Sequence, residues 1–174
     1  MNAIVSITRD WGIGREGKLL VRNREDMRRF KALTTGGTVV MGRKTFESLP
    51  GGPLKDRRNI VLTRDEGWSA EGVEVVHGID EALSLVAGVD PDTVWLIGGA
   101  MLYRSLIDRC RRAYVTRHDV VVEADAYFPN LDADEHWQLV ESDGAGTTAE
   151  GIAYEFVTYE RTDGVASQAE GCDG

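Results

Sequence analysis

An acidic residue near the start of a predicted helix is the first candidate for chemistry. Asn23 can cap this helix, and Asp26 follows three positions later, which is typical of a capping box. Asp26 and Phe30 are four positions apart, so the carboxylate shares a helix face with apolar side chains. A carboxylate there needs a cationic or hydrogen-bond-donating partner. Asp26 therefore either supports the helix N-terminus or binds a ligand whose parallel N–H groups match its two oxygens.

Two segments run from a β-branched strand through glycine into a helix, an order of residues that can bind phosphate. In residues 39–46, Gly42 is followed by the basic pair Arg43 and Lys44. Free N–H groups and the helix dipole attract phosphate at such a start, and basic side chains add charge. The alternative is an exposed basic pair without a ligand.

The second segment, 94–100, contains the pair Gly98-Gly99 before its helix. Glycine lets a backbone approach a pyrophosphate closely. The pair lacks the spacing of the Rossmann fingerprint, so a tight turn without a ligand is an equal interpretation.

Two loops complete the candidate chemistry. A Pro/Gly loop leads to Arg57 and Arg58, and one of these guanidinium groups could hold a carboxylate. The alternative is two exposed charges. Residues 10–18 contain three glycines around one bulky apolar residue, Ile13, which predicts either a mobile lid or an inert surface loop.

The elements that position these residues read as an α/β protein with a mostly parallel central sheet. Strands are predicted at 3–7, 38–41, 59–63, 73–76, 93–97 and 113–117. Helices are predicted after Asn23, near Arg43, and over 79–86 and 100–107. Strands at 136–142 and 152–161 predict a C-terminal antiparallel hairpin joined by Asp143-Gly144-Ala145-Gly146. We expect one domain over 1–161 and a disordered polar tail over 162–174.

Composition excludes several classes of function. The net charge of -9 argues against nucleic acid or an anionic membrane as the main partner. Two distant cysteines, Cys110 and Cys172, argue against a disulfide framework or a zinc site and for a reducing cytoplasm. The first residues predict a strand rather than a secretory signal, and we find no transmembrane run. We expect a cytoplasmic monomer.

The order of these motifs along residues 3–161 resembles dihydrofolate reductase. The resemblance implies an NADPH-dependent reductase that converts 7,8-dihydrofolate to 5,6,7,8-tetrahydrofolate and binds antifolate inhibitors, without a metal. It is carried by the succession Ile4-Val5-Ser6, Gly12-Ile13-Gly14, Asp26 with Phe30, Met41-Gly42-Arg43-Lys44-Thr45, Glu47-Ser48-Leu49, Arg57 with Asn59, Ile97-Gly98-Gly99-Ala100, Tyr103 and Thr116.

The resemblance implies a pterin site around Asp26, the catalytic residue. Asp26 would hold the amino and ring N–H groups of the pterin, and Thr116 would bond to Asp26 or to the pterin amine. Arg57 would bind the carboxylate of the glutamate tail. The other substrate-binding residues that the resemblance implies are Ile4, Val5, Val21, Met27, Phe30, Leu49, Leu54 and Ile97.

The same resemblance implies where NADPH binds. Arg43, Lys44, Thr45 and Arg64 would contact its phosphates, and Gly98-Gly99 would flank the nicotinamide and pyrophosphate across a cis peptide. Residues 8–23 would form the lid. The other cofactor-binding residues implied are Ser6, Ile13, Gly14, Gly42, Ser48, Leu62, Thr63, Ala100, Met101, Leu102 and Tyr103.

The chain departs from the family pattern at three positions. Val21 stands where the family usually has tryptophan, so an indole N–H that helps to hold an active-site water is missing. Arg24 replaces a common proline, and Ala124 replaces a common glycine. These departures bear on lid behaviour and inhibitor affinity more than on the reaction.

Two other functions stay open at this point. A reductase of riboflavin biosynthesis shares the fold and uses NADPH, but Asp26, Phe30 and Arg57 argue against it. A module that kept the fold without turnover would be consistent with Val21. Methotrexate competition separates the first alternative, and NADPH binding without oxidation would identify the second.

Overall fold

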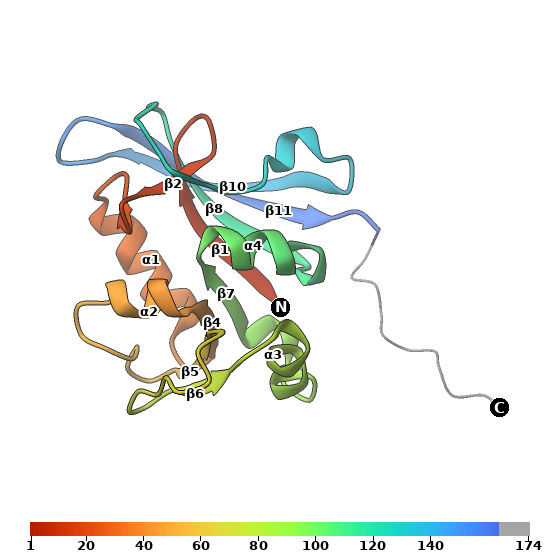
Figure 1. Ribbon diagram of the computed structural model, residues 1–174. Coiled ribbons are helices and arrows are strands. Elements are labelled where there is room, and N and C mark those ends of the chain that lie inside the picture. The colour runs from red at the N-terminus through yellow and green to blue at the C-terminus, as the bar shows by residue number, and fades with distance from the viewer. Residues whose placement is uncertain (164–174) are drawn as a thin grey trace.

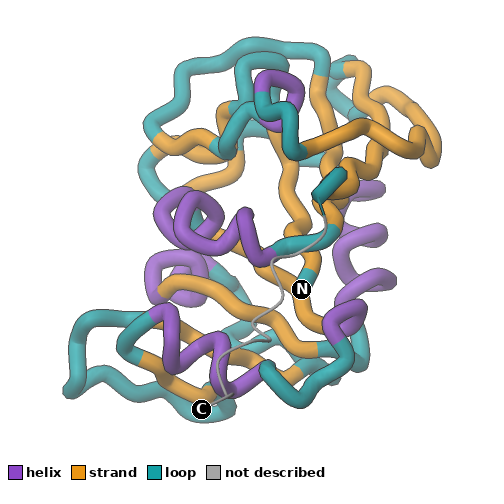
Figure 2. Tube along the Cα trace, turned by 90° about the vertical axis from the view of Figure 1, so that its right-hand side faces the viewer, coloured by secondary structure: helices purple, strands orange, loops and turns teal. Residues whose placement is uncertain are grey.

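The computed structural model describes residues 1–163 as a central sheet with helices on both of its faces (Figure 1, Figure 2). The strands of this sheet, in spatial order, are β10 (Trp137–Thr147), β11 (Ala153–Arg161), β8 (Arg112–His118), β1 (Asn2–Ile7), β7 (Val94–Gly98), β4 (Thr38–Gly42), β5 (Arg58–Leu62) and β6 (Glu74–Val76). The helices are α1 (Arg24–Thr34), α2 (Arg43–Ser48), α3 (Ile79–Val86), α4 (Ala100–Leu106) and the short 3-10 turns η1 (Pro91–Thr93), η2 (Ile107–Arg109) and η3 (Leu131–Ala133).

Most of the sheet is parallel. β1 pairs with β7 and β8, β4 pairs with β5 and β7, and β5 pairs with β6, all in parallel. The two C-terminal strands are antiparallel, β11 to β8 and β10 to β11. This topology confirms the predicted fold class, a mostly parallel sheet with an antiparallel hairpin at one edge. Helices connect the other parallel strands, whereas β5 leads to β6 through a loop.

Alternation along the strands divides the core into two layers. On β7, Leu96 belongs to the larger cluster, which includes Ala82 of α3 and Leu106 of α4. Its neighbour Trp95 belongs to the smaller cluster, against which Phe30 of α1 packs. Successive side chains of a strand point to opposite faces, so α3 and α4 cover one face while α1 and α2 cover the other.

The strand register brings two glycine turns together at one edge. Met41 of β4 lies opposite Gly98 of β7, and Gly42 of β4 lies opposite Leu62 of β5. Because these strands are parallel, the turns that lead into α2 and α4 leave the sheet side by side. Ligands of open α/β sheets bind outside the carboxyl ends of such strands.

The predicted position of the C-terminal turn was wrong. β10 continues through Asp143 to Thr147, and the chain turns after Thr148, whose Oγ1 accepts from Ile152 N at 3.0 Å. Asp143 and Gly144 read as turn residues, but β10 is an edge strand and absorbs them through register shifts. Asp143 also binds Arg29 of α1 at 2.8 Å, a distant partner that local sequence does not reveal.

A second sheet, β3-β2-β9, was missed by the sequence analysis. It joins β2 (Gly12–Arg15), β3 (Lys18–Leu19) and β9 (Ala126–Tyr127). Trp11, which precedes β2, is 7 % exposed and stacks on Phe128 with ring centroids 6.2 Å apart. The predicted lid is therefore anchored by a buried aromatic contact and by strand pairing, and its motion stays a prediction.

Within residues 1–163, the structure has no helix long and apolar enough to cross a membrane. Of the tail predicted over 162–174, residues 164–174 lie outside the described residues.

Leu96→Ala tests the layered core. Leu96 is fully buried in β7, so the substitution should lower the free energy of unfolding by about 2–5 kcal/mol. Leu139→Ala on the edge strand β10 is the matched control, because Leu139 is 40 % exposed and should cost less than about 1 kcal/mol. Urea unfolding measures both, and equal losses would contradict the assigned layers.

Candidate active site

The carboxylate of Asp26 is held between helix α1 and strand β8. Asn23 caps α1, and its Oδ1 accepts from the backbone N–H of Glu25 at 3.1 Å and of Asp26 at 3.2 Å. The Asp26 side chain does not close a capping box, because its Oδ1 accepts from Thr116 Oγ1 at 2.5 Å. The capping role therefore belongs to Asn23, which leaves the Asp26 carboxylate facing the sheet.

Burial controls the charge of Asp26. Its pKa is raised above the ordinary value because burial penalises the carboxylate, while the Thr116 hydrogen bond, His118 and Arg29 act in the opposite direction. Arg29 is itself paired with Asp143 at 2.8 Å and lies over the Phe156 ring at 4.5 Å. A partly buried acid with a shifted pKa beside hydrogen-bond donors is a usual setting of an active-site carboxylate.

Apolar residues from several elements gather on the same face of the sheet. The structure brings together five of the predicted substrate residues in the smaller core cluster or packed against it, namely Ile4, Phe30, Leu49, Leu54 and Ile97. Three others are placed differently. The Val5 side chain belongs to the opposite core layer, Met27 is 53 % exposed, and Val21 is buried. Only the backbone of Val5 can therefore serve a ligand on the Asp26 side.

The two adjacent arginines have different partners. Arg58 binds Glu74 through two nitrogens, at 2.5 and 2.8 Å. Arg57 donates to the Lys55 carbonyl at 2.8 Å and to Thr34 Oγ1 at 3.1 Å, and within residues 1–163 no carboxylate pairs with it. Arg57 is thus the guanidinium group that remains able to receive an external carboxylate.

The glycine turns leave a backbone cradle at the ends of β4 and β7. The Gly98–Gly99 peptide bond is cis, and Gly98 has a φ of 126°. A Cβ atom would lie 3.4 Å from the Tyr103 ring at Gly98 and 3.4 Å from Thr45 Oγ1 at Gly99. The Tyr103 hydroxyl donates to the Ile4 carbonyl at 2.6 Å, so this buried side chain links the cradle to β1.

The basic residues predicted to bind phosphate lie beside this cradle but are not equivalent. Arg43 is already paired with Glu47 at 2.8 Å and with Asp65 at 3.2 Å. Lys44 and Arg64 are exposed, and neither forms an ion pair within the described chain. An anion at this edge would therefore meet Lys44 and Arg64 first, and would compete with carboxylates for Arg43.

The remaining residues predicted to bind the cofactor divide by accessibility. Leu102 is 6 % exposed and packs in the core, Thr63 is 7 % exposed, and Ser6 Oγ lies 3.4 Å from His118 Nδ1. The others lie at strand ends or in the first and last turns of helices: Ile13 and Gly14 on β2, Ser48 on α2, Leu62 on β5, and Ala100 and Met101 on α4.

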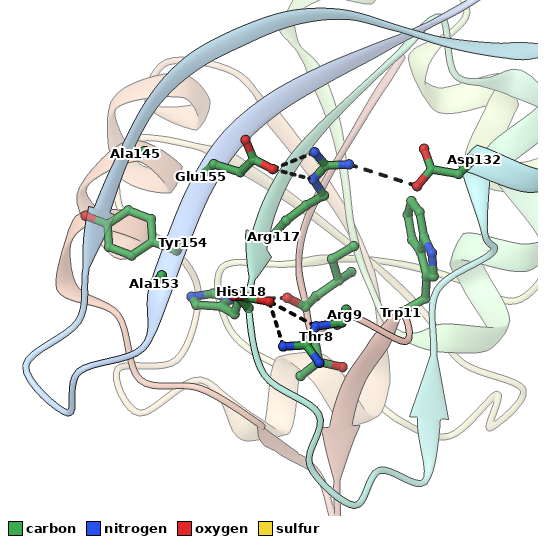
Figure 3. Close-up of a pocket in the computed structure, with 12 residues that line it drawn as sticks. Thr8, Arg9, Trp11, Arg117, His118, Asp132, Ala145, Ala153, Tyr154 and Glu155 are labelled. Carbon is green, nitrogen blue, oxygen red and sulfur yellow. Dashed lines mark hydrogen bonds and ion pairs between the residues drawn. The ribbon is translucent and has the colours of Figure 1, made fainter.

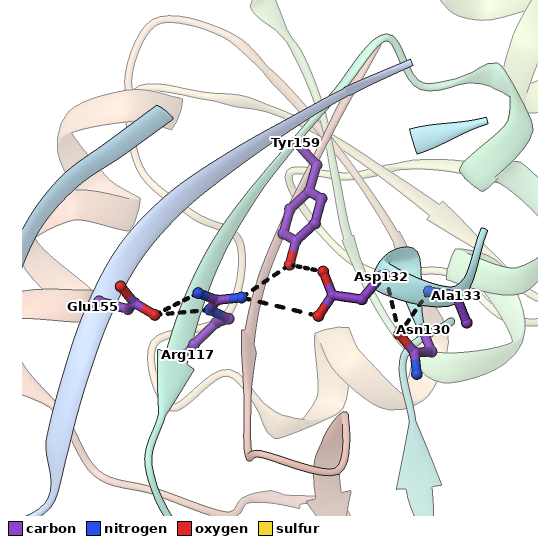
Figure 4. A network of polar contacts seen from close by, with 6 residues as sticks. All are labelled: Arg117, Asn130, Asp132, Ala133, Glu155 and Tyr159. Atoms are coloured by element: carbon purple, nitrogen blue, oxygen red, sulfur yellow. Dashed lines mark hydrogen bonds and ion pairs between the residues drawn. The ribbon is translucent and has the colours of Figure 1, made fainter. Parts of the chain in front are cut away.

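A cavity of about 490 Å³ lies away from Asp26, between the ends of β1, β8 and β11 (Figure 3). Its charged lining is already paired. Arg9 binds Asp119 at 2.7 Å, and Arg117 donates to Glu155 at 2.5 Å. Figure 4 shows that Arg117 also contacts the Tyr159 hydroxyl, at 3.2 Å. Neither Asp26 nor the Gly98-Gly99 cradle lines this cavity, so the candidate active site lies elsewhere.

Two neighbours of Asp26 were not anticipated from the sequence. His118 and Arg29 both act on the charge of Asp26, and His118 Nε2 lies 3.1 Å from Asn23 Nδ2. Arg29 lies three positions after Asp26 on α1, which was a usable signal. His118 lies two positions after Thr116 on β8, so both side chains are on one face of the strand, and this spacing was also a usable signal. Its contact with Asn23 was not, since it joins a strand and a helix far apart in sequence.

Comparisons with known proteins point to one family. A family model described as dihydrofolate reductase matches residues 1–161. A dihydrofolate reductase of Neisseria gonorrhoeae is 41% identical over 135 residues, covering 78% of this chain and 82% of the relative. One of Mycobacterium leprae is 39% identical over 158 residues, covering 86% and 91%.

A solved structure is also similar. Dihydrofolate reductase from Enterococcus faecalis, complexed with NADP(H) and RAB-propyl, superposes with a TM-score of 0.80 and 34% sequence identity, covering 93% of this chain and 96% of the other.

Thr116→Val tests the hydrogen bond to Asp26. The Thr116 hydroxyl lowers the pKa of Asp26, so its removal should move that pKa further upward. Thr116→Ser keeps the hydroxyl and should stay close to the wild type. Carboxyl ¹³C NMR of the ligand-free protein during a pH titration reports the change, and a lower pKa in Thr116→Val would contradict the assigned bond.

Asp26→Asn tests the cost of burying the charge. Folding raises the pKa of Asp26 above 3.8, so the folded state binds this proton more tightly than the unfolded state does. The free energy of unfolding must then fall as pH rises from that value through the folded-state pKa. The ligand-free Asn variant should melt at a higher temperature than the wild type at about pH 8, and the difference should close toward about pH 4. Thermal unfolding across this range measures the difference in melting temperature between the variant and the wild type. A variant that melts below the wild type at the higher pH would contradict the prediction.

Proposed function

The chain belongs to the dihydrofolate reductase family, and we propose that Asp26 binds and orients the pterin ring of its substrate. The protein is an NADPH-dependent oxidoreductase that reduces 7,8-dihydrofolate to 5,6,7,8-tetrahydrofolate. The observation that carries the proposed role is the partly buried Asp26 carboxylate, bonded to Thr116 on the sheet face that carries the cluster of Ile4 and Phe30.

Asp26 would act mainly on binding and polarisation. The two oxygens of Asp26 match the parallel N–H donors of the pterin. Oδ1 would then accept from both Thr116 and one pterin N–H. Burial raises the pKa of Asp26, while the donors of a bound pterin would favour the carboxylate. We therefore propose that the acid holds the ring polarised, and that water admitted beside the lid brings the proton to the pterin nitrogen.

Arg57 and the apolar cluster would hold the rest of the substrate. The aminobenzoyl group would pack on Phe30, Leu49 and Leu54, which share one apolar layer. The carboxylate of the glutamate tail would bind the Arg57 guanidinium, which is already held by the Lys55 carbonyl and the Thr34 hydroxyl. The backbone carbonyl of Ile4 would face the pterin amine, because it accepts from Tyr103 and keeps a second lone pair.

The cradle at Gly98-Gly99 fits a dinucleotide. Gly98 has a φ of 126°, which residues with a side chain rarely adopt, and the absence of side chains here leaves the backbone open beside Tyr103 and Thr45. When bound, NADPH supplies the hydride that the imine carbon of the dihydropterin accepts. Gly98 and Gly99 would hold the pyrophosphate side, with Thr45, Lys44 and Arg64 at the phosphates and Arg43 released from Glu47 or Asp65.

We also propose that the enzyme is a cytoplasmic monomer that binds antifolate inhibitors. Val21 lies buried where the family usually has tryptophan, so a water near the pterin would be held by other groups, Asp26 and Thr116 foremost.

NADPH oxidation with dihydrofolate, followed by absorbance, tests the proposed function. Purified protein should oxidise NADPH only when dihydrofolate is present, and methotrexate should block the reaction. Asp26→Asn should lower kcat/KM for dihydrofolate about 100-fold or more near neutral pH, because the polarising carboxylate is lost. Turnover that Asp26→Asn leaves unchanged would refute the role of Asp26.

Arg57→Leu separates binding of the tail from the chemistry. Loss of a charge-assisted bond should raise KM for dihydrofolate about ten-fold or more, whereas KM for NADPH should stay unchanged. Arg58→Leu is the matched control, because Arg58 is occupied by Glu74. If both variants raise KM for dihydrofolate equally, the carboxylate is not bound at Arg57.

A further inference from the structure

His118 forms an internal link between the sheet and the helix that bears Asp26. It ends β8, is 1 % exposed, and has a partner at each ring nitrogen. Nδ1 lies 3.2 Å from the Ile7 carbonyl and 3.4 Å from Ser6 Oγ, and Nε2 lies 3.1 Å from Asn23 Nδ2. Strand β8 thus touches the start of α1 twice, through His118 at Asn23 and through Thr116 at Asp26.

The helix cap determines the protonation state of this histidine. Asn23 Oδ1 must face the helix, because it accepts from the N–H groups of Glu25 and Asp26. The amide nitrogen of Asn23 is then directed at His118 and can only donate. Nε2 must therefore be an acceptor, which places the ring proton on Nδ1, where it is donated to the Ile7 carbonyl.

We propose that His118 is a positioning residue for Asp26: its neutral ring holds Asn23 in the capping orientation, and the cap holds the first turn of α1 so that Asp26 meets Thr116. The inference rests on the proposed role of Asp26 in binding the pterin. The His118–Asn23 and Thr116–Asp26 contacts both join one face of β8 to the start of α1. A shift of Asn23 would therefore move Asp26, which lies within the same helical turn.

Protonation of His118 would break this arrangement. An Nε2–H would face the N–H groups of the Asn23 amide, and a flipped amide would instead oppose the N–H groups of the helix. Burial lowers the pKa of His118, while the negative charge of Asp26 raises it. From β1 the ring meets the Ser6 hydroxyl and the Ile7 carbonyl, and from β11 it meets the Tyr154 ring, with centroids 6.0 Å apart. His118 also lines the cavity of Figure 3, whose charged groups are paired with one another, Arg9 with Asp119 and Arg117 with Glu155.

A matched pair of variants tests the link. In His118→Gln, the longer amide can reach Asn23 with its oxygen, whereas in His118→Asn the shorter amide keeps a donor for Ile7 but cannot reach Asn23. We expect His118→Asn to lower kcat/KM for dihydrofolate about 3- to 10-fold near neutral pH, with KM for NADPH unchanged. His118→Gln should recover the wild-type value and flatten the acid side of the pH profile, because it has no ring to protonate.

Asn23→Asp gives a readout that does not depend on turnover. Aspartate keeps the helix cap but replaces the donor at Nε2 by an acceptor, so His118 should titrate at a higher pH than in the wild type. Histidine Cε1–H NMR follows this titration. His136→Gln is the control, because the signal that it removes belongs to the exposed His136 ring and the pH profile of kcat/KM should stay unchanged.

The outcomes separate two kinds of failure. The inference is overturned if Asn23→Asp leaves or lowers the titration of His118, or if His118→Gln and His118→Asn lose kcat/KM equally. If the wild type does not reduce dihydrofolate, the proposed function fails instead. The NMR titration still decides whether His118 accepts a hydrogen bond from the Asn23 cap.

Discussion

The bond between Thr116 and Asp26 is the constraint on which the site depends. A carboxylate that is largely removed from water must have donors, and the structure provides one from β8 while Asn23 satisfies the helix end separately. These two sets of bonds together require one position of α1 along strand β8. The register of β1 against β8, with Ser6 opposite Thr116, then sets which groups of β1 face the carboxylate. The pocket is therefore an outcome of strand register as much as of side-chain choice.

Unpaired basic residues at the proposed site favour anionic ligands in an acidic protein. The chain is acidic, with a net charge of -9, and many of its arginines are paired with carboxylates, as Arg9, Arg58 and Arg117 are. Arg57, Lys44 and Arg64 have no such partner within residues 1–163, and they lie at the proposed substrate and cofactor positions. Because the overall field of an acidic protein repels anionic ligands, unpaired cations at the proposed positions would offset that repulsion locally.

The sequence was sufficient for features that depend on local pattern. The β-branched runs, the Asn23 cap and the helix at Ile79–Val86 follow from short-range rules, and the structure confirms them. Features set by distant partners were out of reach. The sequence around Asp143 is typical of a turn, but in the structure this residue lies in a strand and pairs with Arg29. The sequence around Trp11 is typical of a loop, but its ring stacks on Phe128. At the site, residue types were informative at Asp26 and Arg57, whereas the opposite-facing Val5 side chain and the His118 contact depend on strand register.

The restraint on Arg57 has a consequence for ligand choice. Its guanidinium is held by the Lys55 carbonyl and the Thr34 hydroxyl, on a loop that Asn59 fastens through two bonds to Leu54. The rotational freedom of this side chain is therefore lost during folding, before any ligand arrives. A carboxylated tail that binds there gains from an arrangement already formed, whereas a ligand with a neutral tail leaves it unused. In the proposed site, discrimination between these two kinds of tail is built into the empty protein.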